Sequence, residues 1–268
     1  MRILAITGGH SFDRAAFADL LDALPGEVTW REHPDAAIGP DDLADHDVSL
    51  HYDMPGTLPE PYDPPESLRD CLRAARETGH GYVVLHHAIA SWANWDEWSE
   101  FVGGRYLYQP GTVRGAPRPD SGYRHAVEQR ITIEDSTHPV TADLPAHLDL
   151  VDETYLCEVF EDSVTPLLRT NAPMTDDVHF STALAMSGRR GEREGWQHAE
   201  GSSLVGWCRT NGASRLVYLQ PGDTAATLAH PDYRSLIANS LRWAARSIWT
   251  FFTANTVRCV AAHSRCYS

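Results

Sequence analysis

The sequence lacks the cysteine patterns that mark disulfide-rich or zinc-binding domains. Its five cysteines form no Cys-x-x-Cys pair and their number is odd, so neither a disulfide framework nor a zinc knuckle is indicated. They are Cys71, Cys157, Cys208, Cys259 and Cys266. Cys157 and Cys208 lie in apolar strand contexts typical of core residues. We therefore expect reduced thiols and a cytoplasmic protein.

Positive charge and long apolar runs are also scarce. The 268 residues include 37 acidic and only 22 basic residues, which gives a formal net charge of −15. Phosphate backbones repel such a chain and no basic cluster reverses this locally, so no nucleic-acid partner is expected. No apolar run is long enough for a membrane span, and Met1–Ala5 enters a strand without a signal-peptide pattern. The sequence thus predicts no membrane partner.

Two further signatures are missing. Gly8-Gly9 lacks the third glycine of a dinucleotide-binding turn, so no nucleotide cofactor is expected. Hydrolases and amidotransferases hold a nucleophile in the turn after a buried strand such as Tyr82–Leu85, yet no cysteine occurs here from Gly81 to Ser91. The turn carries His86 and His87 instead. Its chemistry is therefore expected to be proton transfer or metal binding.

Strand and helix patterns alternate along the first part of the chain. Strands are predicted at 2–7, 27–32, 47–53 and 81–86, with helices that begin after caps at Ser11 and Asp63. The spacing of Trp92, Trp95 and Trp98 predicts a helix directly after the two histidines. This alternation indicates an α/β fold with a doubly wound, mostly parallel sheet and helices on both faces.

The second part changes character. We assign residues 1–246 to a single domain, in which 105–201 forms an inserted β-rich elaboration with antiparallel alternation and Pro/Gly-rich turns. Residues 204–208 and 215–220 are expected to pair as a hairpin, and a last helix is expected to begin at Pro231. The tail 247–268 has no acidic residue, and both a disordered and a non-native origin remain open.

Four polar clusters follow predicted strands. They are Gly8-Gly9-His10, His51-Tyr52-Asp53, His86-His87 and Pro221-Gly222-Asp223. The carboxyl ends of parallel strands share one rim, so these clusters should meet in one crevice. Imidazoles with carboxylates suit a zinc- or manganese-like ion, and equally an acid/base pair near neutral pH. We predict His10, Asp53, His86 and His87 as metal ligands; a structural, hydrogen-bonded role for each histidine is the alternative.

Substrate contacts are predicted around the same rim. Glu153 follows an apolar strand and is predicted to act in catalysis with His86 and His87, the alternative being a solvated strand end. Tryptophan offers a flat face to a sugar ring, although this helical spacing also fits a core-facing helix. The predicted substrate-binding residues are Gly9, Trp92, Trp95, Tyr155 and Asp223.

Taken together, these segments resemble the trehalose-utilisation (ThuA-like) family from Met1 to about Arg246. Six motifs in order carry the resemblance: Thr7-Gly8-Gly9-His10, Val84–Ala88 with Ser91-Trp92, Gly103-Gly104-Arg105, Thr137–Thr141, Asp152-Glu153-x-Tyr155, and Leu216–Tyr218 with Gly222-Asp223. It implies the flavodoxin-like fold of class I glutamine amidotransferases. The missing cysteine excludes glutaminase activity. Pro221-Gly222-Asp223 stands where many members carry Gly-His-Asp, so only Asp223 keeps a role in that loop.

The resemblance also implies carbohydrate metabolism. We expect an enzyme that acts on a keto-sugar or disaccharide derivative, by isomerisation or keto-glycoside processing, through histidine acid/base chemistry with or without a divalent metal. Its partner would be a small carbohydrate, and a homo-oligomer is left open. The alternative is a non-catalytic sugar-binding or regulatory module. A serine hydrolase ranks third, because Ser91 lies about a turn too late for a nucleophile elbow.

Overall fold

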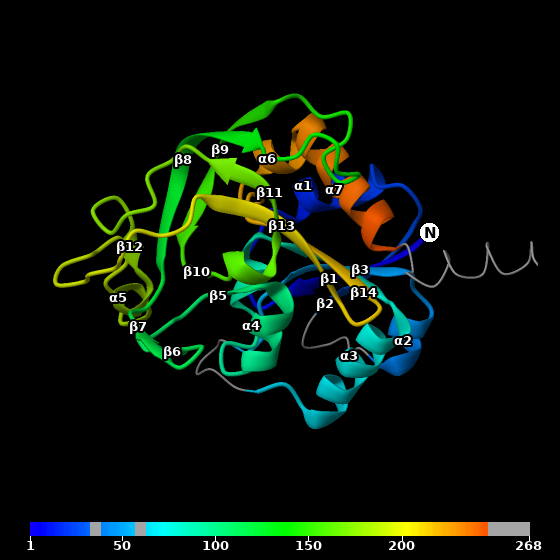
Figure 1. Ribbon diagram of the computed structural model, residues 1–268, viewed down its shortest axis with the longest axis horizontal. Helices are drawn as coiled ribbons and strands as arrows, with labels where there is room; N and C mark the ends of the chain where they lie inside the picture. Colours follow the sequence, from blue (N-terminus) through cyan, green and yellow to red (C-terminus); the bar gives the residue numbers. More distant parts are fainter. Residues whose placement is uncertain (33–38, 57–62, 246–268) are drawn as a thin grey trace, which may run out of the picture.

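A single ten-stranded sheet forms the centre of the molecule (Figure 1). The computed structural model of the protein describes residues 1–32, 39–56 and 63–245, so the predicted tail lies outside the described residues. Within those ranges, no helix is both long and apolar enough to cross a lipid bilayer.

Five parallel strands make up one half of the sheet. Their order across the sheet is β2 (Glu27–Glu32), β1 (Arg2–Gly8), β3 (Val48–Asp53), β4 (Gly81–Leu85) and β14 (Ser214–Leu219). Every residue of β3 and β4 is buried, as expected for strands covered on both faces. This is the flavodoxin-like strand order, which reverses direction between β1 and β3 and so opens a crevice at their carboxyl ends.

Helices cover both faces of this half, which confirms the predicted doubly wound architecture (Figure 1). On one face α1 (Arg14–Asp22), α6 (Ala225–Ala229) and α7 (Pro231–Ala244) pack in one apolar cluster. On the other face α2 (Pro40–Ala44), α3 (Glu66–Thr78) and α4 (Asp96–Val102) pack in a second cluster. The last helix begins at Pro231, as predicted.

Two predicted helix starts are wrong by a few residues. Asp13, not Ser11, caps α1 and accepts a hydrogen bond from the backbone N–H of Ala16. The next predicted start was Asp63, but α3 begins at Glu66. Pro65 disfavours helical geometry in the residue before it, which delays the helix.

Antiparallel strands extend the sheet beyond β14. In order from β14 they are β13 (Leu204–Asn211), β11 (Thr165–Thr170) and β8 (Gly122–Ile133), and β8 pairs with both β9 (His147–Leu156) and β12 (Phe180–Ser181). The predicted hairpin is β13–β14. Short strands β5 (Gly104–Arg105), β10 (Glu158–Val159), β6 (Gly111–Val113) and β7 (Ala116–Arg118) form two small ribbons. The remaining short helices are α5 (Thr182–Met186) and the 3-10 turn η2 (Glu161–Ser163).

The segment after β4 differs from the predicted tryptophan-rich helix. A short 3-10 helix, η1 (His86–Ala90), follows the strand, and α4 begins only at Asp96. His86 and Trp92 have positive φ angles of 50° and 51°, which no regular helix allows. The chain thus turns sharply at His86 and again at Trp92, and of the three tryptophans only Trp98 lies within α4.

Candidate active site

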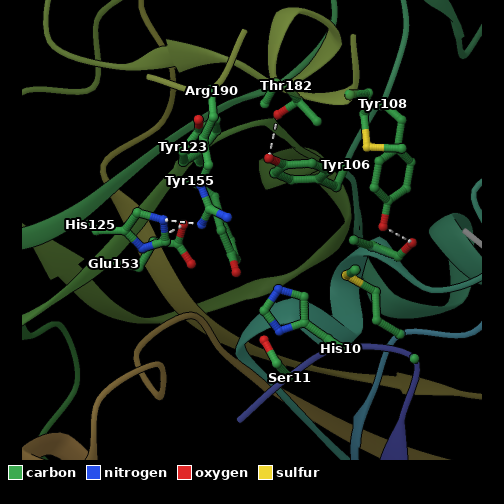
Figure 2. Close-up of a pocket in the computed structure, with 15 residues that line it drawn as sticks. His10, Ser11, Tyr106, Tyr108, Tyr123, His125, Glu153, Tyr155, Thr182 and Arg190 are labelled. Carbon is green, nitrogen blue, oxygen red and sulfur yellow. Dashed lines mark hydrogen bonds and ion pairs between the residues drawn. The ribbon is translucent and has the colours of Figure 1, made fainter. Parts of the chain in front are cut away.

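A cavity of about 480 Å³ opens at the carboxyl ends of the parallel strands (Figure 2). Gly9 and His10, from the turn after β1, line one side of it. The opposite wall comes from strands β8 and β9 of the antiparallel part of the sheet and from the loop after β5, and it is strongly aromatic. Its tyrosines are Tyr106, Tyr108, Tyr123 and Tyr155. The cavity therefore lies where the strand order places a ligand crevice, with a wall that the parallel strands alone do not supply.

His86 is the central polar residue beside this cavity. Its Nδ1 donates to the carbonyl oxygen of Gln220 over 2.7 Å, which leaves Nε2 facing the cavity residues. Nε2 lies 3.1 Å from Oε2 of Glu153 and 2.8 Å from the hydroxyl oxygen of Tyr155. Complete burial opposes the charged imidazole, but the bond and charge of Glu153 and the charge of Asp152 outweigh it and raise the pKa of His86.

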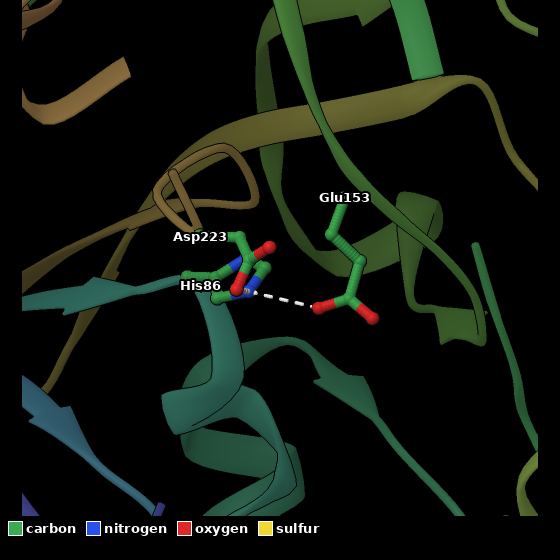
Figure 3. A group of neighbouring side chains, drawn as sticks. All are labelled: His86, Glu153 and Asp223. Carbon is green, nitrogen blue, oxygen red and sulfur yellow. Dashed lines mark hydrogen bonds and ion pairs between the residues drawn. The ribbon is translucent and has the colours of Figure 1, made fainter. Parts of the chain in front are cut away.

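Glu153 and Asp223 form a cluster around Nε2 of His86 (Figure 3), and a second histidine, His125, lies against Glu153 (Figure 2). One ligand-type atom from each of His86, Glu153 and Asp223 lies within 4.8 Å of the others. Nδ1 of His125 approaches Oε1 of Glu153 at 3.3 Å and Oδ2 of Asp223 at 3.6 Å. The bond to Asp223 is the largest influence on His125 and raises its pKa, whereas burial opposes it. Each carboxylate is thus held between two imidazoles.

Asp152 fixes the relative position of the two cluster carboxylates. It is fully buried, and its Oδ1 accepts the backbone N–H groups of Glu153 at 2.9 Å and Asp223 at 3.0 Å. The same side chain also accepts from Gly222 at 2.8 Å and Thr224 at 3.2 Å. A single carboxylate therefore ties the end of β9 to the loop after β14.

The other two rim histidines pack together instead of joining the cluster. The rings of His10 and His87 lie 4.7 Å apart. Nε2 of His87 bonds to the carbonyl of Tyr52 at 3.1 Å, and burial lowers its pKa well below the usual value. His10 lines the cavity; loss of hydration there, followed by the charge of His86, lowers its pKa as well. Both are therefore neutral imidazoles near pH 7, and of the two only His10 lines the cavity.

Asp53 is not among the described residues whose donor atoms form a metal-type group. Alternate residues of β3 face opposite sides of the sheet, so Asp53 shares a face with His51 and not with Tyr52. Its Oδ1 lies 3.1 Å from Nδ1 of His51, in the buried layer that also holds Trp98. The predicted set of His10, Asp53, His86 and His87 thus forms no common group. Only His86 belongs to the cluster that the described residues form.

The predicted tryptophan platform is replaced by tyrosines. Trp92 and Trp95 are buried in the core beneath α3 and α4, and neither lines the cavity. Among the other predicted substrate-binding residues, Gly9 and Tyr155 line the cavity and Asp223 belongs to the cluster. The core-facing alternative therefore holds for both tryptophans.

Several residues of the site were not predicted from the sequence. Tyr123 and His125 stand two apart at the start of β8, and Tyr155 pairs with Tyr123 across the β8–β9 ladder. Tyr106 and Tyr108 show the same spacing in the loop after β5. A period of two is a visible signal for residues that share a face. The strand register that brings these pairs to the cavity depends on the folded structure and cannot be read from their spacing.

Comparisons with known proteins agree with this architecture. The profile of the ThuA family, described as trehalose utilisation, matches residues 2–244. A ThuA-like protein from Parabacteroides merdae superposes with a TM-score of 0.64 at 15% identity, covering 91% of this chain and 90% of that chain. No curated protein sequence matches the chain.

Two other solved structures share the fold. PurLQS from Thermotoga maritima has a TM-score of 0.50 at 13% identity, covering 90% of this chain and 98% of that chain. Agd3, described as a novel carbohydrate deacetylase, has a TM-score of 0.52 at 12% identity, covering 90% of this chain but only 32% of that chain. The fold is the flavodoxin-like type shared with glutamine amidotransferases. With the profile matched over nearly its whole length, the chain belongs to the trehalose-utilisation (ThuA) family.

Proposed function

We propose that this protein is an enzyme that enolises a ketone-bearing sugar in the tyrosine-walled cavity. The observation that carries the proposal is the position of the His86–Glu153–Asp223 cluster against a cavity of about 480 Å³. Membership of the ThuA family suggests a role in trehalose utilisation, and a keto-glucoside derived from a disaccharide is a substrate consistent with that role.

The shape and lining of the cavity suit a sugar. Its volume falls in the range of small-molecule sites, and tyrosine rings offer flat apolar faces to the C–H side of a pyranose. The hydroxyl of Tyr106 bonds to Thr182 and that of Tyr108 to the carbonyl of Ala90, so these rings are held in place. Agd3, one of the solved structures with this fold, is itself described as acting on carbohydrate.

Proton abstraction next to a ketone needs a base and a group that stabilises the enolate oxygen. His10 lines the cavity as a neutral imidazole and is the base in this proposal. It takes the proton from the carbon beside the ketone; the C–H electron pair becomes the new C=C bond, and the C=O π pair moves to oxygen. The enolate oxygen lies at the cluster side, where the hydroxyl of Tyr155 donates to it.

The enolate has two productive fates. In the first, the hydroxyl on the α-carbon gives its proton to the enolate oxygen and becomes the new carbonyl, while the C=C electron pair takes a proton at the former carbonyl carbon, which isomerises the ketose. Expulsion of an alkoxide from the carbon β to the ketone, followed by its protonation, cleaves a keto-glycoside. Both fates share the first step, so exchange of the α-proton with solvent tests the proposal before the product is known.

The test is deuterium incorporation from deuterated water into a panel of 3-keto-glucosides, followed by NMR. We expect deuterium beside the ketone, and a loss of at least ~10²-fold in rate for His10→Ala, the lower end of what a positioned base contributes. His198→Ala is the matched control, because His198 lies on the exposed loop outside the cavity.

The rival proposal is a sugar-binding module without catalysis. The aromatic wall favours it, since tyrosine platforms serve binding and chemistry alike. The binding module becomes the preferred proposal if the keto-glucosides bind saturably but their α-protons do not exchange with solvent above background, even with added divalent metals.

A further inference from the structure

We propose that His86, Glu153, Asp223 and His125 bind one divalent transition-metal ion of the zinc or manganese kind. The inference deepens the proposed function, because the ion would polarise the ketone whose α-proton is removed. The four side chains come from η1, β9, β8 and the loop after β14, and they converge beside the cavity (Figures 2 and 3).

The donor atoms already face one another. Oε2 of Glu153 and Oδ1 of Asp223 lie 3.1 and 3.8 Å from Nε2 of His86. The second oxygen of each carboxylate faces Nδ1 of His125, at 3.3 and 3.6 Å. Metal–ligand bonds to nitrogen and carboxylate oxygen are about 2.0–2.2 Å long, so ligands of one ion lie roughly 3–4 Å apart. Each histidine–carboxylate pair has this spacing, and the donor atoms of His86, Glu153 and Asp223 all lie within 4.8 Å of one another. His125 joins them through the second oxygen of each carboxylate.

The orientation of His86 is that of a metal ligand. A ligating imidazole almost always donates its other N–H to a carbonyl or carboxylate, which fixes the tautomer. Nδ1 of His86 donates to the carbonyl of Gln220, and the side chain of that glutamine in turn accepts from the backbone N–H of Tyr155. His86 is also held at a φ of +50°, a conformation uncommon for non-glycine residues, which fixes the direction of its side chain at the end of β4.

A divalent ion would balance the charge of both carboxylates without requiring either imidazole to be protonated. In residues 1–32, 39–56 and 63–245, Glu153 and Asp223 form ion pairs with His86 and His125, and the nearest guanidinium contact of the group is from Arg190 to Nε2 of His125 at 3.2 Å. The chain contains no lysine. An enolate formed beside two carboxylates would be repelled by them unless their charge is balanced, and a divalent ion balances both.

Lysine is also the residue that activates ketones through a Schiff base, so that route is closed to this chain. A Lewis acid would polarise the carbonyl strongly, in addition to the hydrogen bond from Tyr155. Two imidazoles with two carboxylates favour zinc- or manganese-type ions over magnesium and calcium, which prefer all-oxygen sites.

The test uses the untagged full chain, stripped with a chelator and titrated with Zn²⁺, Mn²⁺ and Mg²⁺ by calorimetry. We expect one equivalent of Zn²⁺ or Mn²⁺ and much weaker binding of Mg²⁺. Asp223→Asn and His125→Gln should each weaken binding by at least ~10-fold, because each removes a donor. Both residues are partly exposed, so these variants are expected to fold, which circular dichroism checks.

His10→Gln is the matched histidine variant outside the cluster, and it should keep full metal binding. Absence of a bound ion in the wild type, or unchanged binding in both Asp223→Asn and His125→Gln, overturns the metal site. Metal binding that depends on these residues while no sugar exchanges its proton leaves the metal site intact and removes the proposed enolisation. The two failures are therefore distinguishable.

Discussion

At the scale of single residues, Asp152 shows how a side chain outside the cavity can organise the site. It makes no contact with the cavity, yet it holds the backbone of both Glu153 and Asp223. Hydrogen bonds to a charged acceptor contribute about 1.5–3 kcal/mol each. The residue thus acts on the site by positioning two other carboxylates.

We predict that Asp152→Asn lowers the free energy of unfolding by about 2 kcal/mol, because one acceptor oxygen and its charge are lost. It should also weaken metal binding by ~10-fold, as expected for an outer-shell partner. Asp149→Asn is the control, because Asp149 lies exposed on the same strand, where it forms ion pairs with Arg130 and His147. This substitution should change neither quantity appreciably. Equal effects of the two substitutions would remove the positioning role.

The wrong predictions for the tryptophans and Asp53, and the failure to find His125, have physical causes. Tryptophans three apart satisfy a buried helix face and a pair of tight turns equally well, so spacing could not separate the two. For Asp53 the signal was present, because alternation along β3 already places it with His51 and away from Tyr52. His125 could not be found, since its role depends on the β8–β9 register.

At the scale of elements, the sequence predicted where the strands end. It did not predict which side chains of the following turns face the cavity. The buried run of β4 and the parallel alternation around it identify the rim on which His10, His86 and Asp223 lie. Glu153 was predicted for the same site on the expectation that it follows an apolar strand, but it lies buried within β9. The geometry of each turn decides which of its side chains face the cavity. The turn after β1, which contains Gly9, is an example.

Gly9 has a φ of +78°, and a Cβ placed there would lie 2.3 Å from the carbonyl oxygen of Met54. We predict that Gly9→Ala destabilises the protein by more than the ~1–2 kcal/mol of left-handed strain alone, because the backbone of the neighbouring turn must move. Met54 lines the cavity, so sugar binding should weaken too.

Gly188→Ala separates the two contributions. Gly188 has a similar φ of +88°, but no atom lies within 4 Å of the added Cβ. This variant should show the strain alone in chemical denaturation, with sugar binding unchanged. If Gly9→Ala were no worse than Gly188→Ala, the close approach to Met54 would have no energetic consequence.

At the scale of the whole molecule, buried histidines make stability depend on pH. His80 directly precedes β4, and its ring nitrogens bond to Ser49 of β3 at 2.6 Å and to the carbonyl of His46 at 3.1 Å. Burial, followed by the nearby His51, lowers the pKa of His80 to about 4. The titratable groups that influence it, His46 and His51, are themselves basic and do not stabilise its charged form.

The sign of the effect follows from proton binding. In the unfolded chain this histidine titrates near 6.5, so between pH 6.5 and 4 the unfolded state binds more protons than the folded state. The contribution of neutral His80 to the free energy of unfolding is fully present above pH 6.5. It is lost as the pH falls through that window, by up to about 3 kcal/mol.

We predict that His80→Gln flattens this part of the stability profile, measured by urea denaturation at pH 7.5 and pH 5. Glutamine keeps a hydrogen bond within reach of Ser49 but does not titrate. His198→Gln, on the exposed loop, is the control and should leave the slope unchanged. An unaltered slope in His80→Gln would assign the acid sensitivity to other buried groups, with His87 the next to test.

The site draws its parts from both sides of the β13–β14 hairpin. The turns after the parallel strands supply His10, His86 and Asp223, whereas β8 and β9 supply His125, Glu153, Tyr123 and Tyr155. Tyr106 and Tyr108 come from the loop after β5. In evolutionary terms, the shape of the cavity can change through substitutions at Tyr106, Tyr108 and Tyr123 without the replacement of any residue of the His86–Glu153–Asp223 cluster. The cluster itself can persist only if residues on both sides of the hairpin are retained together.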